Sequence, residues 1–389
     1  MVASSSGSQD PDPLRTLAAE TMHRHWRDPG YTCPNIERYP WLWLWDSCFH
    51  ALIWDRLGEP GRAICELRAV FAGQDRDSGF VPHMGYFGAP EAGAAFWGRR
   101  GFSSITQPPM FGHAVAELTR RGVDVGDDVV EASVAGLRFL LQHRRRHASG
   151  LIELVHPWES GADDSPRWDD LAGRPYSSEQ WHRVKGSLLE TVERSPSGAP
   201  LANPAFGVAS VAFNALVAFN AFELAELTGD APMRSAATTL VGSLDERWDP
   251  SHSTWIDAGP TEGGSGRIRT AEGLLPLLVT SDDPAAAAAF DSLVDPEAHG
   301  GRFGPSGVHR GEPTFSATTY WRGPAWPQIS YLLWVAARRR NRHDIAASIS
   351  GSTVAGALRS GLAEYWDPDT GHGGGATPQS WTALALLMS

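Results

Sequence analysis

The stretch FGVASVAFNALVAFNAFELAELT, residues 206–228, is apolar on nearly every side of a helix between Val208 and Leu227. A helix that is apolar all round lies buried among other elements instead of covering a surface. The stretch therefore predicts an inner helix that other helices of the chain enclose.

Helical patterns recur on both sides of this stretch. Each has apolar residues at positions i, i+3 and i+4, with Gly, Pro, Asp or Ser near its ends. The period-2 alternation that is typical of strands is scarce. The expected helices span about 12–26, 46–58, 60–73, 106–122, 127–148, 178–195, 206–228, 232–246, 269–279, 283–293, 324–340, 342–362 and 380–388.

The order of these helices predicts an all-α protein. Helices that follow one another in pairs either stack as a solenoid or close into a double-layered ring, and the absence of a fixed-period repeat disfavours the solenoid. No Pro/Ser-rich linker divides the chain, so we expect one domain over residues 11–389 after a disordered segment, residues 1–10. The clusters of aromatic and charged residues described below fall in the long loops between these helices, where a rigid scaffold commonly carries its functional site.

Composition excludes several classes of protein. The chain has 389 residues, of which 42% are hydrophobic and 20% charged, as in globular proteins. Its net charge of −12 argues against a nucleic-acid partner, which would need Lys and Arg clusters. No apolar run reaches about 18 residues, and the N-terminus lacks the regions of a signal peptide. We therefore expect a cytoplasmic protein with no membrane span, either a monomer or a homo-oligomer.

Tryptophan is unusually frequent, with 16 residues, and many of them stand next to charged residues. A pyranose ring offers one apolar face for stacking and a rim of hydroxyl groups for polar contacts. Aromatic packing between helices explains some of the tryptophans but not this coincidence, which indicates a sugar-binding site. The coincidence occurs at Trp41-Leu42-Trp43-Leu44-Trp45-Asp46, Trp158-Glu159, Trp168-Asp169, Trp321-Arg322 and Glu364-Tyr365-Trp366-Asp367.

The stretch HPWESGADDSPRWDD, residues 156–170, combines acidic residues with two tryptophans. Cleavage of a glycosidic bond needs two carboxyl groups, one protonated and one ionised. Asp163 and Asp164 are adjacent, and like charges so close raise each other's pKa, which helps to keep one acid protonated. The chemistry alone does not choose between them. The alternative is a solvated acidic loop in which Asp-Asp-Ser-Pro begins a helix.

A second carboxyl group is expected from another loop. Glu364, in LAEYWDPDTGHGGGATPQSW (362–381), follows a helical pattern and precedes two aromatic residues and a glycine-rich segment. The HGGG segment lacks the Lys-Ser/Thr pair and the preceding strand of a phosphate-binding loop, and no GxSxG elbow accompanies it. HExxH and paired CxxC motifs are absent, so no metal or other cofactor is predicted.

Several motifs together resemble a known family. They are YPWLWLWDSCFHA (39–51), TQPPMFGHAV (106–115), HPWESGADDSPRWD (156–169), YWRGPAWPQISYLL (320–333) and WTALALL (381–387). They are similar to motifs of the (α/α)6-barrel, inverting α-glycosidases of glycoside hydrolase family 63 and their trehalase relatives. The chain most resembles the short bacterial members that hydrolyse mannosylglycerate and glucosylglycerate. The resemblance runs from about Tyr39 to the C-terminus and implies an (α/α)6 toroid.

The resemblance also implies roles for individual residues. Asp163 falls on the general-acid position and Glu364 on the general-base position. The residues implied to contact the substrate are Tyr39, Trp43, Trp45, Asp46, Gln107, Trp158, Trp321, Arg322, Trp326 and Trp381.

Two residues beside the acid depart from the family pattern. Ala162 replaces a large residue and opens space, and Asp164 replaces an Asn or aromatic residue and adds a negative charge close to the sugar. We expect both residues to affect the choice of substrate. Arg99 and Arg100, in the loop GRRGFSS (98–104), are candidates to clamp a substrate carboxylate.

We therefore expect an inverting α-glycoside hydrolase that acts on a small α-glucoside or α-mannoside, without a cofactor. Asp163 and Glu364 should lie about 6.5–9.5 Å apart, as inversion requires. One alternative is a sugar-binding barrel that has lost catalysis, which the presence of both carboxyl groups disfavours. Another is a barrel that transfers the glycosyl group or acts on a specialised natural-product glycoside, for which Ala162 and Asp164 leave room.

Overall fold

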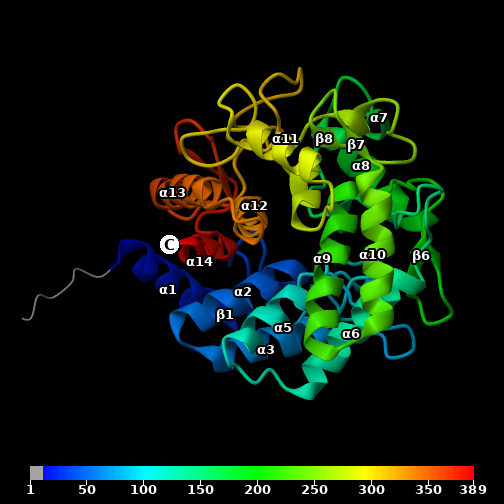
Figure 1. Cartoon of the computed structure of the whole chain (residues 1–389). Coiled ribbons are helices and arrows are strands. Elements are labelled where there is room, and N and C mark those ends of the chain that lie inside the picture. Colours follow the sequence, from blue (N-terminus) through cyan, green and yellow to red (C-terminus); the bar gives the residue numbers. More distant parts are fainter. Residues whose placement is uncertain (1–11) are drawn as a thin grey trace, which may run out of the picture.

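The computed structural model describes residues 12–389, and the expectation for residues 1–10 lies outside this range. Six elements that follow one another around a ring form its inner layer (Figure 1). They are α2 (Leu44–Leu57), α5 (Phe111–Arg120), α9 (Val211–Thr228), the 3-10 helix η5 (Glu272–Leu278), α12 (Pro327–Arg339), and η6 (Ser380–Leu384) with its continuation α14 (Ala385–Met388).

An outer helix packs against each inner element. The outer helices are α1 (Pro13–His25), α3 (Pro60–Phe71), α6 (Asp127–Gln142), α10 (Ala231–Asp245), α11 (Asp283–Val294) and α13 (His343–Ser360). Five of them follow their inner partner directly in the chain, whereas α1 comes from the opposite end of the chain and packs against η6 and α14 (Figure 1). The six inner–outer pairs close a ring, so the predicted all-α, (α/α)6 toroid is confirmed. The assignment of residues 11–389 to one domain stays a prediction.

The loops between these helices hold only short elements. The strands form two-stranded antiparallel ladders: β1 (Trp26–Arg27) with β2 (Tyr31–Thr32), β3 (Leu42–Trp43) with β4 (Met84–Gly85), β5 (Glu193–Arg194) with β6 (Pro200–Ala202), β7 (Trp248–Asp249) with β8 (Thr254–Trp255), and β9 (Tyr365–Trp366) with β10 (Gly373–Gly374). The short helices are α4 (Ala94–Trp97), η1 (Pro157–Ser160), η2 (Pro166–Trp168), α7 (Asp169–Ala172), α8 (Ser178–Leu188), η3 (Leu189–Thr191) and η4 (Ser265–Arg267).

Helix α9 is the inner helix that its sequence predicts. By length and composition it could cross a membrane, contrary to the expectation of no membrane span, but 78% of this apolar window is buried in the protein. Its few polar side chains bind neighbouring segments. Asn214 accepts a hydrogen bond from Ile152 N (2.8 Å) and donates to Ile152 O (2.9 Å), and Asn220 accepts from His113 N (2.7 Å). The apolar helix therefore also fixes the loop that follows α6.

Several predicted helices differ from the structure. The helix expected over 178–195 ends at Leu188 as α8, and residues 193–194 form strand β5. The helix expected over 269–279 is the 3-10 helix η5, which contains Pro276, and proline cannot donate the backbone hydrogen bond of a regular α-helix. Helix α6 ends at Gln142, whereas the helix expected there runs to about residue 148.

The reason for the early end of α6 is a buried ion pair. Arg144 donates to both carboxylate oxygens of Glu159, at 3.0 and 2.6 Å, and both side chains are fully buried. Glu159 also accepts hydrogen bonds from the backbone N–H groups of Thr106 and Val155. A continued helix would keep Arg144 away from this carboxylate. Glu159 therefore holds the 156–170 loop in place and is not available as a catalytic acid.

Asn214→Leu should lower the free energy of unfolding by at least about 2 kcal/mol, because it leaves the buried N–H and C=O of Ile152 without partners. Urea denaturation measures the change. Glu226→Ala, at an exposed position of the same helix, is the control and should stay within about 0.5 kcal/mol of the unsubstituted chain. Equal stability of the two variants would contradict this account of α9.

Candidate active site

A cavity of about 460 Å³ lies where the inner helices α2 and η6 begin. Segments that are far apart in the sequence form its wall, including the residues before α2, the 156–170 loop, helix α8 and the loop before η6. The lining residues are Pro34, Arg38, Tyr39, Trp43, Trp45, Asp46, Gln107, Trp158, Gly161, Asp163, His182, Lys185, Tyr320, Glu364, Gln379 and Trp381. Aromatic rings, acids and bases thus surround one space.

Most of the residues singled out in the sequence border this cavity. They are Tyr39, Trp43, Trp45, Asp46, Gln107, Trp158, Asp163, Glu364 and Trp381. The structure thus brings together both proposed catalytic carboxyl groups and a set of aromatic and polar side chains. Their roles stay predictions.

Four of the singled-out residues lie behind the cavity wall. Trp321 stacks on Trp326, with ring centroids 3.8 Å apart, and both are buried. Arg322 donates two hydrogen bonds to Asp169, at 2.8 and 2.7 Å. Asp164 is paired with Lys185.

Glu364 is held by donors on each of its carboxylate oxygens. Ala376 N donates to Oε2 (2.8 Å), and the Tyr39 hydroxyl donates to Oε1 (3.1 Å). Gly375, at φ +74°, lies so close that a Cβ atom there would clash with the Glu364 carboxylate. The glycine-rich segment therefore brings the backbone N–H of Ala376 onto this carboxylate. Burial raises the pKa of Glu364, and the N–H of Ala376 opposes this effect.

Asp163 follows a tight turn in the 156–170 loop. Gly161, at φ +75°, packs against the Trp45 ring where a side chain would clash. Trp181 Nε1 donates to the backbone carbonyl of Asp163 (2.7 Å), and Trp158 Nε1 donates to its carboxylate (3.2 Å). Burial raises the pKa of Asp163, the charge of Lys185 lowers it, and the neighbouring Asp164 raises it.

Lys185 was missed in the sequence. Its ammonium group lies 2.6 Å from Asp163 Oδ2 and 2.5 Å from Asp164 Oδ1, and only 5% of its side chain is exposed. One signal could have revealed it, because Lys185 is the only lysine among the 33 Lys and Arg residues of the chain. The other missed lining residues include Arg38 and His182, as well as Tyr320 and Gln379, which stand within two positions of Trp321 and Trp381.

Several buried polar atoms around the cavity have no protein partner. They are Trp43 Nε1, Gln107 Oε1 and Gln379 Oε1. Asp46 lines the same region, is 3% exposed, and burial raises its pKa well above the usual range. Unpaired buried donors and acceptors are costly unless a ligand binds them. The hydroxyl groups of a sugar ring could supply the missing hydrogen-bond partners.

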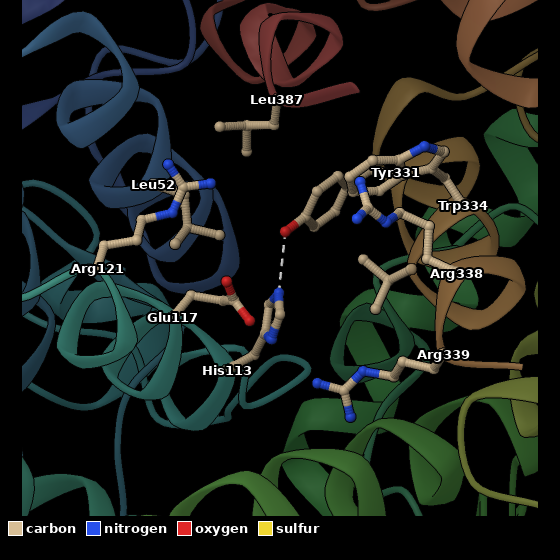
Figure 2. A pocket seen from close by; sticks show the side chains of 10 residues that line it. Leu52, His113, Glu117, Arg121, Tyr331, Trp334, Arg338, Arg339 and Leu387 are labelled. Carbon is tan, nitrogen blue, oxygen red and sulfur yellow. Dashed lines mark hydrogen bonds between the residues drawn. The ribbon is translucent and has the colours of Figure 1, made fainter. Parts of the chain in front are cut away.

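A second pocket, of about 260 Å³, lies between α2, α5, α12 and α14 (Figure 2). His113 and Glu117 border it, and with Glu223 they form a group close enough to hold a metal ion. However, Arg120 and Arg339 already bind the Glu223 carboxylate, and His113 Nε2 is bonded to the Tyr331 hydroxyl (Figure 2). The two guanidinium groups disfavour a cation at this position.

Arg99 and Arg100 are not placed as carboxylate clamps. Arg99 donates to Gly73 O (2.7 Å), and Arg100 pairs with Glu91 at an exposed position. Neither residue borders the cavity of Asp163 and Glu364, so this expectation was wrong.

Curated relatives match the chain over nearly its whole length. The chain is 28% identical to the mannosylglycerate hydrolase of Thermus thermophilus, over 95% of this chain and 99% of that protein. It is 26% identical to the glucosylglycerate hydrolase of Mycolicibacterium hassiacum, over 90% of this chain and 91% of that protein.

Solved structures of two glycosidases share the fold of this chain. The glycoside hydrolase family 63 mannosylglycerate hydrolase from Thermus thermophilus, in complex with Tris and D-glycerate, matches with a TM-score of 0.84 and 28% identity, over 97% of this chain and 99% of that chain. The neutral trehalase of Saccharomyces cerevisiae shares the fold, with a TM-score of 0.61 and 12% identity, over 97% of this chain and 79% of that chain.

A family model agrees with these similarities over most of the sequence. The model of the mannosylglycerate hydrolase MGH1-like glycoside hydrolase domain matches residues 39–382. The chain therefore belongs to the family of MGH1-like glycoside hydrolases.

Proposed function

We propose that this glycoside hydrolase cleaves a small α-glycoside of glycerate, either mannosylglycerate or glucosylglycerate, with inversion at the anomeric carbon. The observation that carries the proposal is that Asp163 and Glu364, from separate loops, border one cavity with aromatic rings and unpaired polar atoms. The relatives to which the chain is similar are named mannosylglycerate hydrolase and glucosylglycerate hydrolase.

The mechanism follows from the surroundings of each carboxyl group. Asp163 protonates the oxygen of the leaving glycerate while the bond to the anomeric carbon breaks. Glu364, held as a carboxylate by Ala376 N–H and the Tyr39 hydroxyl, removes a proton from a water molecule that attacks the opposite face. Hydrolysis in this way leaves a free sugar of inverted anomeric configuration and glycerate.

The remaining lining residues bind the sugar. Tyr39, Trp43, Trp45 and Trp381 offer ring faces and edges, and Asp46, Gln107 and Gln379 offer hydrogen bonds to hydroxyl groups. The Asp46 carboxyl and the Gln107 carbonyl are buried, so hydrogen bonds to them are strengthened by the low local dielectric.

Asp163→Asn and Glu364→Gln should each lower kcat at least about 100-fold, because each removes one proton-transfer group. Release of mannose or glucose from the two glycerate glycosides measures the effect, and thermal unfolding checks that the fold is kept. Glu190→Gln, at an exposed position, is the control and should have unchanged kcat. Full activity in either cavity variant would reject the assignment.

The first product should be the β-anomer, because an inverting enzyme acts on an α-glycoside. Proton NMR during the first minutes of the reaction, before mutarotation, distinguishes the anomers. Initial appearance of the α-anomer would exclude the proposed roles of the two carboxyl groups.

The acidic limb of the pH profile of kcat/KM should lie above the ordinary glutamate pKa of about 4.3, because burial raises the pKa of Glu364 and the base must be ionised. Tyr39→Phe removes a hydrogen bond that stabilises the carboxylate, so this limb should move to still higher pH. A limb that moves down, or stays in place, would show that Glu364 does not set it.

A further inference from the structure

Lys185 occupies an unusual position for the only lysine of the chain. It lies on α8, and its ammonium group bridges the two adjacent carboxylates Asp163 and Asp164 at the cavity wall. The mechanism proposed above needs a protonated Asp163. An ammonium group 2.6 Å away has the opposite effect, because a nearby positive charge stabilises the ionised form of a carboxyl group.

Lys185 is the cation that acts on Asp163. The other titratable groups that line the cavity or act on this carboxyl are Arg38, Asp46, Asp164, His156, His182, Tyr39, Tyr320 and Glu364. Burial lowers the pKa of His156 to about 4, so its ring is neutral near pH 7, and burial raises the pKa of both tyrosines, so they are neutral as well. The charge of Glu364 disfavours ionisation of Asp163. Of these titratable neighbours, Lys185, at 2.6 Å, is therefore the one that favours the carboxylate form of Asp163 against the effect of burial.

We propose that an anionic aglycone activates its own hydrolysis by taking over Lys185 from Asp163. The carboxylate of the bound aglycone pairs with the Lys185 ammonium, and Asp163, freed from this ion pair, takes up one proton from solvent. The proposal rests on the proposed function, since it takes a glycerate glycoside as the substrate.

The charges balance in this exchange. With both aspartates ionised, the cluster of Asp163, Asp164 and Lys185 carries one net negative charge. The aglycone carboxylate adds one negative charge, and protonation of Asp163 removes one, so the net charge of the site is unchanged. Both steps raise the pKa of Asp163, because its carboxyl group loses a positive neighbour and gains a negative one.

The structure explains why Lys185 stays in place during the exchange. Asp164 binds the same ammonium group, and the rings of Trp158 and Trp181 lie 5.7 and 6.0 Å from it. An ammonium group has three donors that can serve separate acceptors, whereas the planar guanidinium of arginine favours a paired contact with one carboxylate. His182, three residues earlier on α8, borders the same cavity. Asp164 thus anchors Lys185 while Asp163 is exchanged for the substrate.

The test compares two substrates that differ only in the aglycone charge: the α-glycoside of glycerate and the α-glycoside of glycerol with the same sugar. In the unsubstituted enzyme, the basic limb of the pH profile of kcat should lie at least about one pH unit higher for the glycerate glycoside. In Lys185→Met this difference should vanish, and the preference in kcat/KM for the glycerate glycoside should fall at least about tenfold. Arg183→Met removes an exposed charge from the same helix. This control should keep both the difference in the basic limb and the preference for the glycerate glycoside.

A binding measurement tests the proton uptake without turnover. Calorimetry with D-glycerate, in buffers of different ionisation enthalpy at pH 7, should show uptake of close to one proton per bound glycerate. Asp163→Asn should abolish the uptake. Because the chain has one lysine, enzyme labelled with ¹⁵N-lysine has one side-chain ammonium signal, which should shift with D-glycerate and not with glycerol.

The outcomes separate the inference from the proposed function. Hydrolysis of neither glycoside would overturn the proposed function and the inference with it. Hydrolysis of the glycerate glycoside with the same basic limb as the glycerol glycoside, or glycerate binding without proton uptake, would overturn the inference alone.

Discussion

Closure of the ring is the constraint on which the active site depends. Helix α1 packs against η6 and α14, so the two ends of the described chain meet. Hydrogen bonds then join the loops that follow α1 and precede η6: Ser380 N donates to Pro34 O (2.9 Å), and Asn35 Nδ2 donates to Pro378 O (2.9 Å). Tyr39 and Glu364 lie on these two loops. Their hydrogen bond is possible only because the ring is closed.

The two carboxyl groups of the cavity are stabilised in different ways, although burial raises the pKa of both. Glu364 receives two neutral donors directly, one backbone N–H and one phenol, and the charge of Arg38 also favours its carboxylate form. Asp163 faces an ammonium group and another carboxylate, whose effects on its pKa oppose each other. A base that must stay ionised suits the first environment. An acid whose protonation depends on the ligand suits the second.

Much of the fold could be predicted from the sequence because its signals are local. The apolar surface of residues 208–227 requires a buried helix, and the regular pairing of the other helices predicts a closed double layer. One error arose where a distant partner decided the local structure. The end of α6 at Gln142 depends on Arg144 reaching Glu159, and the pattern of apolar residues carries no information on that contact.

For the active site, the sequence by itself determined the motifs, the two carboxyl groups, and a set of aromatic residues of which most border one cavity. Only the tertiary structure decided that Trp321, Arg322, Trp326 and Asp164 lie behind the cavity wall and that Lys185 lies at it. The physical reason is that the protonation state of a carboxyl group depends on charges a few ångströms away in space. Lys185 follows Asp163 by 22 positions in the sequence, and only the packing of α8 against the 156–170 loop brings the two charges together.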